Sequence, residues 1–208
     1  MQTTKEKVSY CIGLETGKNL KQQFADMDFK FLSDGFHDAL KDTPPQLDKE
    51  EIQSILVALK NQIETQQRQH FTRISEENKQ RGEAFLTENK EKEDVVTLQS
   101  GLQYKVLTSG PGKGPRPTPL DVVKIHYRGS FIDGRVFDSS YQRGQPVSFP
   151  LNRVITGWSE ALQKMQVGDK WQVVIPSYLA YAEMGYGQEI GPNSTLIFEI
   201  ELLGINET

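Results

Sequence analysis

The spacing of apolar residues changes its period near residue 93. Before that point apolar positions recur every three to four residues, in segments 10–24 and 29–40 and again after residue 48, which is typical of amphipathic helices. After it, apolar and polar positions alternate, and most of the Gly, Pro, Val and aromatic residues lie there. The sequence therefore predicts an α+β protein with an all-α domain at residues 1–92 and a β-rich domain at residues 93–208.

One long helix is expected to connect the two domains. Asp48 is a good N-cap, and Glu51 lies three residues later, at the spacing of a capping box. From there to about Lys92 the chain has no proline and one glycine, Gly82. A continuous helix of about 45 residues would be roughly 65 Å long. Its apolar stripe is dense at the start and thins beyond Phe85, so we expect its second half to be a solvated arm.

The first half of this helix needs apolar cover that its own domain supplies poorly. Two short helices offer little area, and helical domains this small are marginal when alone. A second copy of the same segment, related by two-fold symmetry, would supply the missing surface. We therefore expect a homodimer formed through residues 1 to about 75. A self-contained three-helix cap is the alternative.

Composition and charge argue against several classes of function. The formal net charge is -4, and the basic residues are interspersed with acidic ones, so we expect no nucleic-acid partner. No run of about 18 apolar residues is present, which argues against a membrane span. The first residues lack the apolar segment of a secretory signal, so we expect a cytoplasmic location as written; a periplasmic or outer-membrane-associated location is the alternative if a signal peptide was removed. Cys11 is the only cysteine, and we expect it to be a small buried hydrophobe.

Strand alternation in the second domain separates a buried face from a solvated one. In residues 122–128 apolar side chains alternate with Lys, His and Arg, so His126 is expected to point toward water. The same alternation is present in residues 171–175 and 196–202, and one short helical segment, residues 157–165, precedes them. This pattern predicts an antiparallel sheet wrapped around a single helix.

Two segments, residues 127–140 and 154–158, bring apolar side chains together around tight turns with one acid, Asp138. We expect them to form an apolar cup that suits an uncharged, compact group such as a prolyl ring. Its expected lining is Tyr127, Phe137, Val154, Ile155, Trp158, Tyr181 and Phe198. A lone carboxylate argues against paired acid/base chemistry, and no phosphate loop, metal-ligand spacing or nucleophile elbow is present. We expect neither a cofactor nor a metal.

These segments resemble the FKBP-type peptidyl-prolyl cis-trans isomerases. The resemblance rests on residues 127–140, 154–158, 179–181 and 195–203, and it covers roughly residues 100–205. It implies a half-open antiparallel sheet curled on a short helix, with a hydrophobic pocket that catalyses rotation about X-Pro bonds in folding polypeptides. It also implies that rapamycin-class macrolides inhibit the protein.

The first domain is similar to the dimerising arm of the bacterial Mip-like members of that family. The similarity rests on Ser9-Tyr-Cys-Ile-Gly13 and on Gly17-x-x-Leu20, which precede the long helix. It implies a homodimer whose arms meet at the N-terminal domains, with long helices that hold two catalytic domains apart as a V and with chaperone activity. A dimer that acts mainly as a chaperone for unfolded chains, with incidental turnover, is the alternative function.

The family resemblance implies a catalytic role for five residues. Trp158 would form the pocket floor beneath the prolyl ring, with Tyr127 and Phe137 as walls. Asp138 would lie near the reacting amide, and Tyr181 would donate its hydroxyl to a substrate carbonyl.

The family resemblance also implies seven substrate-binding positions, which are Val154, Ile155, Phe198, Arg143, Val147, Ile190 and Tyr186. Of these, Ile155 would hold a substrate carbonyl through its backbone N–H, and Arg143 would pair with Asp138 and keep it ionised. Three departures from the family pattern touch the rim: Val147 replaces an aromatic, Ala182 replaces a glycine, and Glu189 adds a charge.

Overall fold

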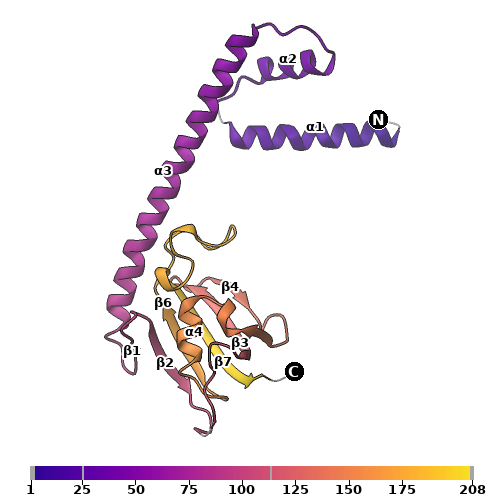
Figure 1. Ribbon diagram of the computed structural model, residues 1–208. Coiled ribbons are helices and arrows are strands. Elements are labelled where there is room, and N and C mark those ends of the chain that lie inside the picture. Colours follow the sequence, from indigo (N-terminus) through magenta and orange to yellow (C-terminus); the bar gives the residue numbers. More distant parts are fainter. Residues whose placement is uncertain (1–2, 25, 113, 207–208) are drawn as a thin grey trace. The chain divides into compact units, whose positions relative to one another are not determined.

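The computed structural model describes residues 3–24, 26–112 and 114–206, and the chain divides into two compact units between Gln62 and Ile63. The first unit contains α1 (Thr4–Gln23), α2 (Phe29–Leu40) and the beginning of α3 (Lys49–Asn89), as Figure 1 shows. The second unit contains the rest of α3 and an antiparallel sheet. The predicted α+β class is confirmed, and α3 runs without a break from one unit into the other.

Side-chain caps start all three helices. Thr3 and Glu6 form a reciprocal capping box on α1, in which the Glu6 amide donates to Thr3 Oγ1 at 3.2 Å. Asp28 caps α2 and accepts two backbone N–H groups. Asp48 accepts from the amide of Glu51 at 2.8 Å, so the predicted start of the long helix is confirmed.

The first unit has no buried core within its own chain. None of its described residues is buried, and apolar side chains from all three helices are exposed. Cys11 is exposed too, which contradicts the expectation of a small buried hydrophobe. The reason is that α1 as a whole is exposed, since Leu20 alone among its described side chains is even half-buried.

The second unit is built on one antiparallel sheet in the order β1-β2-β6-β7-β3-β4, with β5 paired to β3. Its strands are β1 (Val96–Thr97), β2 (Gln103–Thr108), β3 (Val122–Phe131), β4 (Val136–Ser139), β5 (Val147–Pro150), β6 (Lys170–Ile175) and β7 (Leu196–Ile205). Burial alternates strictly along β7, and the first seven residues of β3 also alternate, so the predicted strand faces are confirmed.

The helix α4 (Thr156–Leu162) lies against the buried face of the sheet and completes the core. It ends three residues earlier than the predicted segment 157–165. The reason is a change to tighter turns, in which the Lys164 amide donates to Ala161 O at 2.9 Å and the Met165 amide to Leu162 O at 3.1 Å.

The second half of α3 is not a solvated arm, contrary to the prediction. Gly82 and Asn89 are buried, and Ile74, Ser75 and Asn78 on the same side of the helix are half-buried. These positions lie on a helix face built mainly from small and polar side chains rather than apolar ones. An apolar pattern therefore gives no sign of this contact.

Two contacts show how closely α3 approaches the sheet unit. A Cβ at Gly82 would lie only 2.3 Å from Thr195 Oγ1, so the helix can come this near only with glycine at that position. Asn89 Nδ2 donates to Gln103 Oε1 at 2.8 Å in a buried hydrogen bond, and Gln103 Nε2 donates to Leu86 O at 2.8 Å. Residues 63–89 therefore fold as part of the second unit.

No helix among the described residues is both long enough and apolar enough to span a membrane.

Candidate active site

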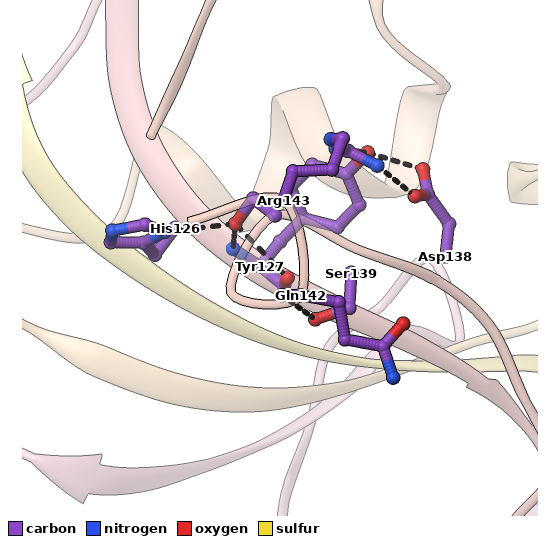
Figure 2. A network of polar contacts seen from close by, with 7 residues as sticks. His126, Tyr127, Asp138, Ser139, Gln142 and Arg143 are labelled. Atoms are coloured by element: carbon purple, nitrogen blue, oxygen red, sulfur yellow. Dashed lines mark hydrogen bonds and ion pairs between the residues drawn. The ribbon is translucent and has the colours of Figure 1, made fainter. Parts of the chain in front are cut away.

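Three polar side chains from one hairpin and the turn after it form a closed triangle (Figure 2). The Tyr127 hydroxyl, on β3, donates to Asp138 Oδ2, on β4. The Arg143 guanidinium donates through Nη1 to Asp138 Oδ1 and through Nη2 to the Tyr127 hydroxyl at 2.8 Å. The β3–β4 register, which pairs Gly129 with Asp138, sets the two strands so that these groups meet.

The triangle fixes the charge of each member. Burial tends to raise the pKa of Asp138, but hydrogen bonds from Tyr127 and Arg143 outweigh it and hold that pKa below its ordinary value of 3.8. Burial and the Asp138 carboxylate raise the pKa of Tyr127 above 10.0, its ordinary value. At neutral pH the site therefore holds one ionised carboxylate and a protonated phenol.

A second set of hydrogen bonds holds the turn after β4. The buried Ser140 hydroxyl accepts from the Tyr127 amide at 2.8 Å and lies 2.9 Å from His126 Nδ1. The His126 ring stacks on Tyr141 with 4.5 Å between centroids. His126 is thus half-buried under an aromatic ring, whereas the sequence had placed it toward water. Strand alternation gives the side of the sheet correctly but does not show that a turn folds over it.

The floor and walls beside the triangle are aromatic. The Trp158 ring, on α4, makes edge contacts with Tyr127 at 5.0 Å and with Phe198 at 5.1 Å between centroids. Phe137 meets Phe198 in the same way at 5.6 Å. Gly129 on β3 makes this possible, because a Cβ there would lie 2.7 Å from the Phe137 ring and 2.8 Å from Phe198.

These side chains enclose two adjoining hollows. One has a volume of about 380 Å³ and is lined by Tyr127, Phe137, Asp138, Phe149, Arg153, Val154, Ile155, Trp158, Tyr181, Tyr186 and Phe198. The other, of about 360 Å³, shares four of these residues and adds Gly187, Gln188, Glu189 and Ile190. All but two of the predicted site residues thus line one continuous groove.

The two exceptions lie nearby in different roles. Arg143 reaches the groove through Asp138 and Tyr127. Val147 on β5 pairs with Ile125 and packs against the core, and it does not line either hollow.

The most prominent lining residue that sequence reasoning missed is Phe149. Its ring contacts Trp158 edge-on at 5.9 Å between centroids. The signal was available, because Phe149 follows Val147 by two residues on β5 and so shares its side of the strand. Arg153, the last residue of the 3-10 helix η1 (Leu151–Arg153), and Gln188 were also missed, because neither position carries a periodic signal.

Three N–H or O–H donors of residues that line this groove have no acceptor among the described residues. None of the hydrogen bonds found among the described residues uses the Ile155 amide, while its carbonyl accepts from Trp158 at 3.0 Å and starts α4. The Trp158 indole N–H is buried without an acceptor in the described part of the chain. Burial and the nearby Tyr186 and Asp138 raise the pKa of Tyr181, so its hydroxyl stays protonated.

This groove is a binding pocket that has the Asp138 carboxylate in its aromatic hollow and Glu189 in the adjoining one. No group of three or more His, Cys, Asp or Glu side chains among the described residues is placed to hold a metal ion. The arrangement can bury an apolar ring, donate hydrogen bonds to carbonyl oxygens, and hold a carboxylate beside them.

Comparison with known proteins gives this arrangement a family. Residues 114–203 match the FKBP-type peptidyl-prolyl cis-trans isomerases, and residues 5–106 match the domain amino-terminal to the FKBP-type peptidyl-prolyl isomerase. The chain therefore belongs to the FKBP-type peptidyl-prolyl cis-trans isomerases, and it is an enzyme that isomerises X-Pro bonds.

Relatives that match along the full length place it more narrowly. The chain is 40% identical over 207 residues to outer membrane protein MIP of Legionella longbeachae, which covers 100% of this chain and 88% of that protein. It is 42% identical over 204 residues to the FKBP-type 22 kDa peptidyl-prolyl cis-trans isomerase of Escherichia coli, with 98% and 96% covered. The crystal structure of FkpA from Escherichia coli superposes with a TM-score of 0.76 at 32% identity and covers 99% of this chain and 98% of that one. The predicted Mip-like membership is confirmed.

Proposed function

We propose that the aromatic hollow holds the prolyl ring of a polypeptide, with Trp158 beneath the ring and Phe137 and Phe198 at its sides. The observation that carries this proposal is an aromatic hollow that contains a single ionised carboxylate. The Ile155 amide and the Tyr181 hydroxyl would each donate a hydrogen bond to a carbonyl oxygen of the peptide, on either side of the X-Pro bond. No covalent step is required, because the reaction is a rotation.

The pocket lowers the barrier by acting on the planar amide. Uncatalysed rotation faces about 20 kcal/mol because resonance gives the C–N bond partial double-bond character. The planar amide is more charge-separated than the twisted one, so transfer from water into an apolar hollow disfavours the planar form. The Asp138 carboxylate adds to this effect when it lies beside the carbonyl oxygen, since that oxygen loses negative charge as the amide twists.

A protease-free assay of cis-to-trans relaxation on a short X-Pro peptide tests this assignment. Asp138→Ala is expected to lower kcat/KM by about tenfold to a hundredfold, the size of a lost charged hydrogen-bond partner. Asp133→Ala is the matched control, because Asp133 is an exposed carboxylate in the turn of the same hairpin and does not line the groove. Equal rates for the two variants would exclude the proposed role of Asp138.

We infer that the active form is a homodimer joined through residues 1 to about 75. The support is that no described residue of the first unit is buried, which leaves a helical unit without a core of its own. Its exposed large apolar side chains are Val8, Tyr10, Ile12, Leu14, Phe29, Phe31, Phe36, Leu40, Leu47, Ile55, Leu56, Val57 and Leu59. A second copy offers the same surface in return, as two-fold symmetry requires.

Light scattering after size exclusion tests the dimer. The expected mass is twice the 23.6 kDa of one chain. Leu56→Glu is expected to give the single-chain mass, and Gln53→Glu, which changes an exposed polar position of the same helix, is expected to leave the dimer intact. A single-chain mass for the unaltered protein would end this proposal.

A chaperone role beside the isomerase is the second function that we propose. It is supported by large exposed side chains of the segment that borders the groove: Met184 is 85% exposed, and Tyr186, which lines the groove, is 64% exposed. A dimer would present two such surfaces and gain from their linkage. Asp138→Ala should then still suppress the aggregation of an unfolded protein while it fails on a short peptide. Loss of both activities together would contradict a separate chaperone role.

The apolar groove is also proposed to bind rapamycin-class macrolides. Its combined aromatic floor and carbonyl-binding donors suit a large, mostly uncharged ring. Rapamycin is expected to compete with the peptide and to change the fluorescence of Trp158. Activity that rapamycin leaves unchanged would refute this.

A further inference from the structure

The flap, residues 182–195, forms one side of the groove and is fastened on its other side by α3. Tyr186 and Ile190 of the flap line the groove. From the contacts of the flap we infer that Ser75 and Asn78 on α3 are positioning residues of the isomerase, which hold the flap where its side chains meet the substrate. The inference rests on the function proposed above for the groove.

The fastening consists of side-chain hydrogen bonds between segments more than a hundred residues apart. Asn78 Nδ2 donates to Pro192 O at 2.8 Å and lies 3.5 Å from Ser194 Oγ. Asn193 Nδ2 donates to Ser75 Oγ at 2.8 Å. These hydrogen bonds are partly buried, and Pro192 itself is buried, so water competes only partly for them.

The fastened residues connect directly to the groove wall. The Asn193 amide donates to Ala182 O at 2.8 Å, which closes the base of the flap. Within the flap, Tyr186 and Ile190 exchange two backbone hydrogen bonds, of 2.8 and 3.1 Å. The Tyr186 ring then stacks on Tyr181 with 4.8 Å between centroids. A shift of residues 192–193 therefore moves the aromatic wall.

The flap also has room to move toward α3. A separate hollow of about 260 Å³ lies between them, with Asn78 and Arg81 of α3 on one side and Gln188 and Glu189 of the flap on the other. Gln188 and Glu189 line the substrate groove as well. The flap is thus a thin wall between two hollows, and the bonds to Ser75 and Asn78 fix its edge.

Loss of these bonds should act on binding rather than on the chemical step. A flap that leaves its position for part of the time weakens the apparent affinity by the fraction of molecules in the competent form. Once substrate is bound, the wall is in place and rotation proceeds at the ordinary rate. KM should rise while kcat changes little.

The experiment uses Asn78→Ala and Ser75→Ala in the full chain, with kinetics on a short X-Pro peptide and hydrogen exchange of the flap amides. Ser75→Thr keeps the hydroxyl and serves as the conservative variant. Gln80→Ala is the matched control on the same helix, since Gln80 is exposed and its one side-chain hydrogen bond among the described residues is from Nε2 to Glu76 Oε1, at 2.8 Å.

We expect each alanine variant of the fastening to raise KM about threefold to tenfold, the worth of one hydrogen bond, with kcat within about twofold. The amides of Tyr186 and Ile190 should exchange faster by a similar factor, and Ser75→Thr and Gln80→Ala should match the unaltered protein in both. KM or flap exchange equal to that of Gln80→Ala would overturn the inference, as would a fall in kcat at unchanged KM. If the function proposed for the groove is wrong, a different result shows it, because Asp138→Ala would then keep full activity.

Discussion

Replacement of Gly82 by alanine sets two effects on the stability of the second unit against each other. Gly82 lies inside α3, where alanine is favoured over glycine by about 1 kcal/mol. The new Cβ would lie 2.3 Å from Thr195 Oγ1 and 3.1 Å from Thr195 Cβ, and Thr195 is buried and short, so it cannot swing aside freely. Overpacking of this kind costs roughly 1–3 kcal/mol. The net expectation is a destabilisation of about 1 kcal/mol, or a fall of about 2–4 °C in the unfolding midpoint.

Both tryptophans report on this unit, so the assay can be specific. Trp158 and Trp171 lie in the second unit, and urea or thermal unfolding followed by their fluorescence measures its stability alone. A double-mutant cycle with Thr195→Ala separates the two effects. Without the Thr195 hydroxyl, Gly82→Ala should lose most of its steric cost and approach the gain of about 1 kcal/mol that helix propensity predicts.

The coupling between the two sites is the decisive quantity. We expect it to be about 1–3 kcal/mol, most of the overpacking effect. If Gly82→Ala stabilised the unit by about 1 kcal/mol whether or not Thr195 was present, α3 would not approach the sheet as closely as described. The second half of α3 would then be solvated rather than packed against the sheet unit.

Three other changes have expected outcomes. Hydrogen bonding holds the pKa of Asp138 below 3.8, so this carboxylate adds stability above that pH, and the stability is lost as pH falls through the lower folded pKa. kcat/KM should therefore stay flat near neutral pH. Arg143→Ala should move the acid limb of the pH–rate profile to higher pH, and an unmoved limb would contradict the pairing. Ala182→Gly should raise the melting midpoint slightly, because the left-handed φ of 50° costs alanine roughly 1–2 kcal/mol, whereas the extra unfolded-state entropy of glycine costs roughly 0.5–1 kcal/mol. A lower midpoint would refute the strain. A fragment of residues 63–208 should keep peptide activity and unfold at a clearly higher temperature than a fragment of residues 93–208. Equal melting curves would show that α3 adds no stability to the domain.

Local rules predicted much of this fold. The caps at Asp48 and the alternation in β7 depend on neighbours within a few residues, and both agree with the structure. The lining of the cup was predicted from aromatic and aliphatic residues around two turns, but no local rule brings Phe137 to Phe198, and the roles of the groove residues came from the family resemblance. The α3 contact escaped because its key residues, such as Gly82 and Asn78, are small or polar, and their partners lie over a hundred residues away.

The absence of a buried core in the described part of the first unit has a consequence for biosynthesis. Residues 1–62 leave the ribosome before residues 63–208, and at about 5–20 residues per second those later residues take on the order of ten seconds more. During that time the sheet unit cannot yet form, and in the proposed dimer the apolar helices wait longer still, until a second chain arrives. In that dimer the helical unit, although synthesised before the sheet unit, would reach its final structure after it.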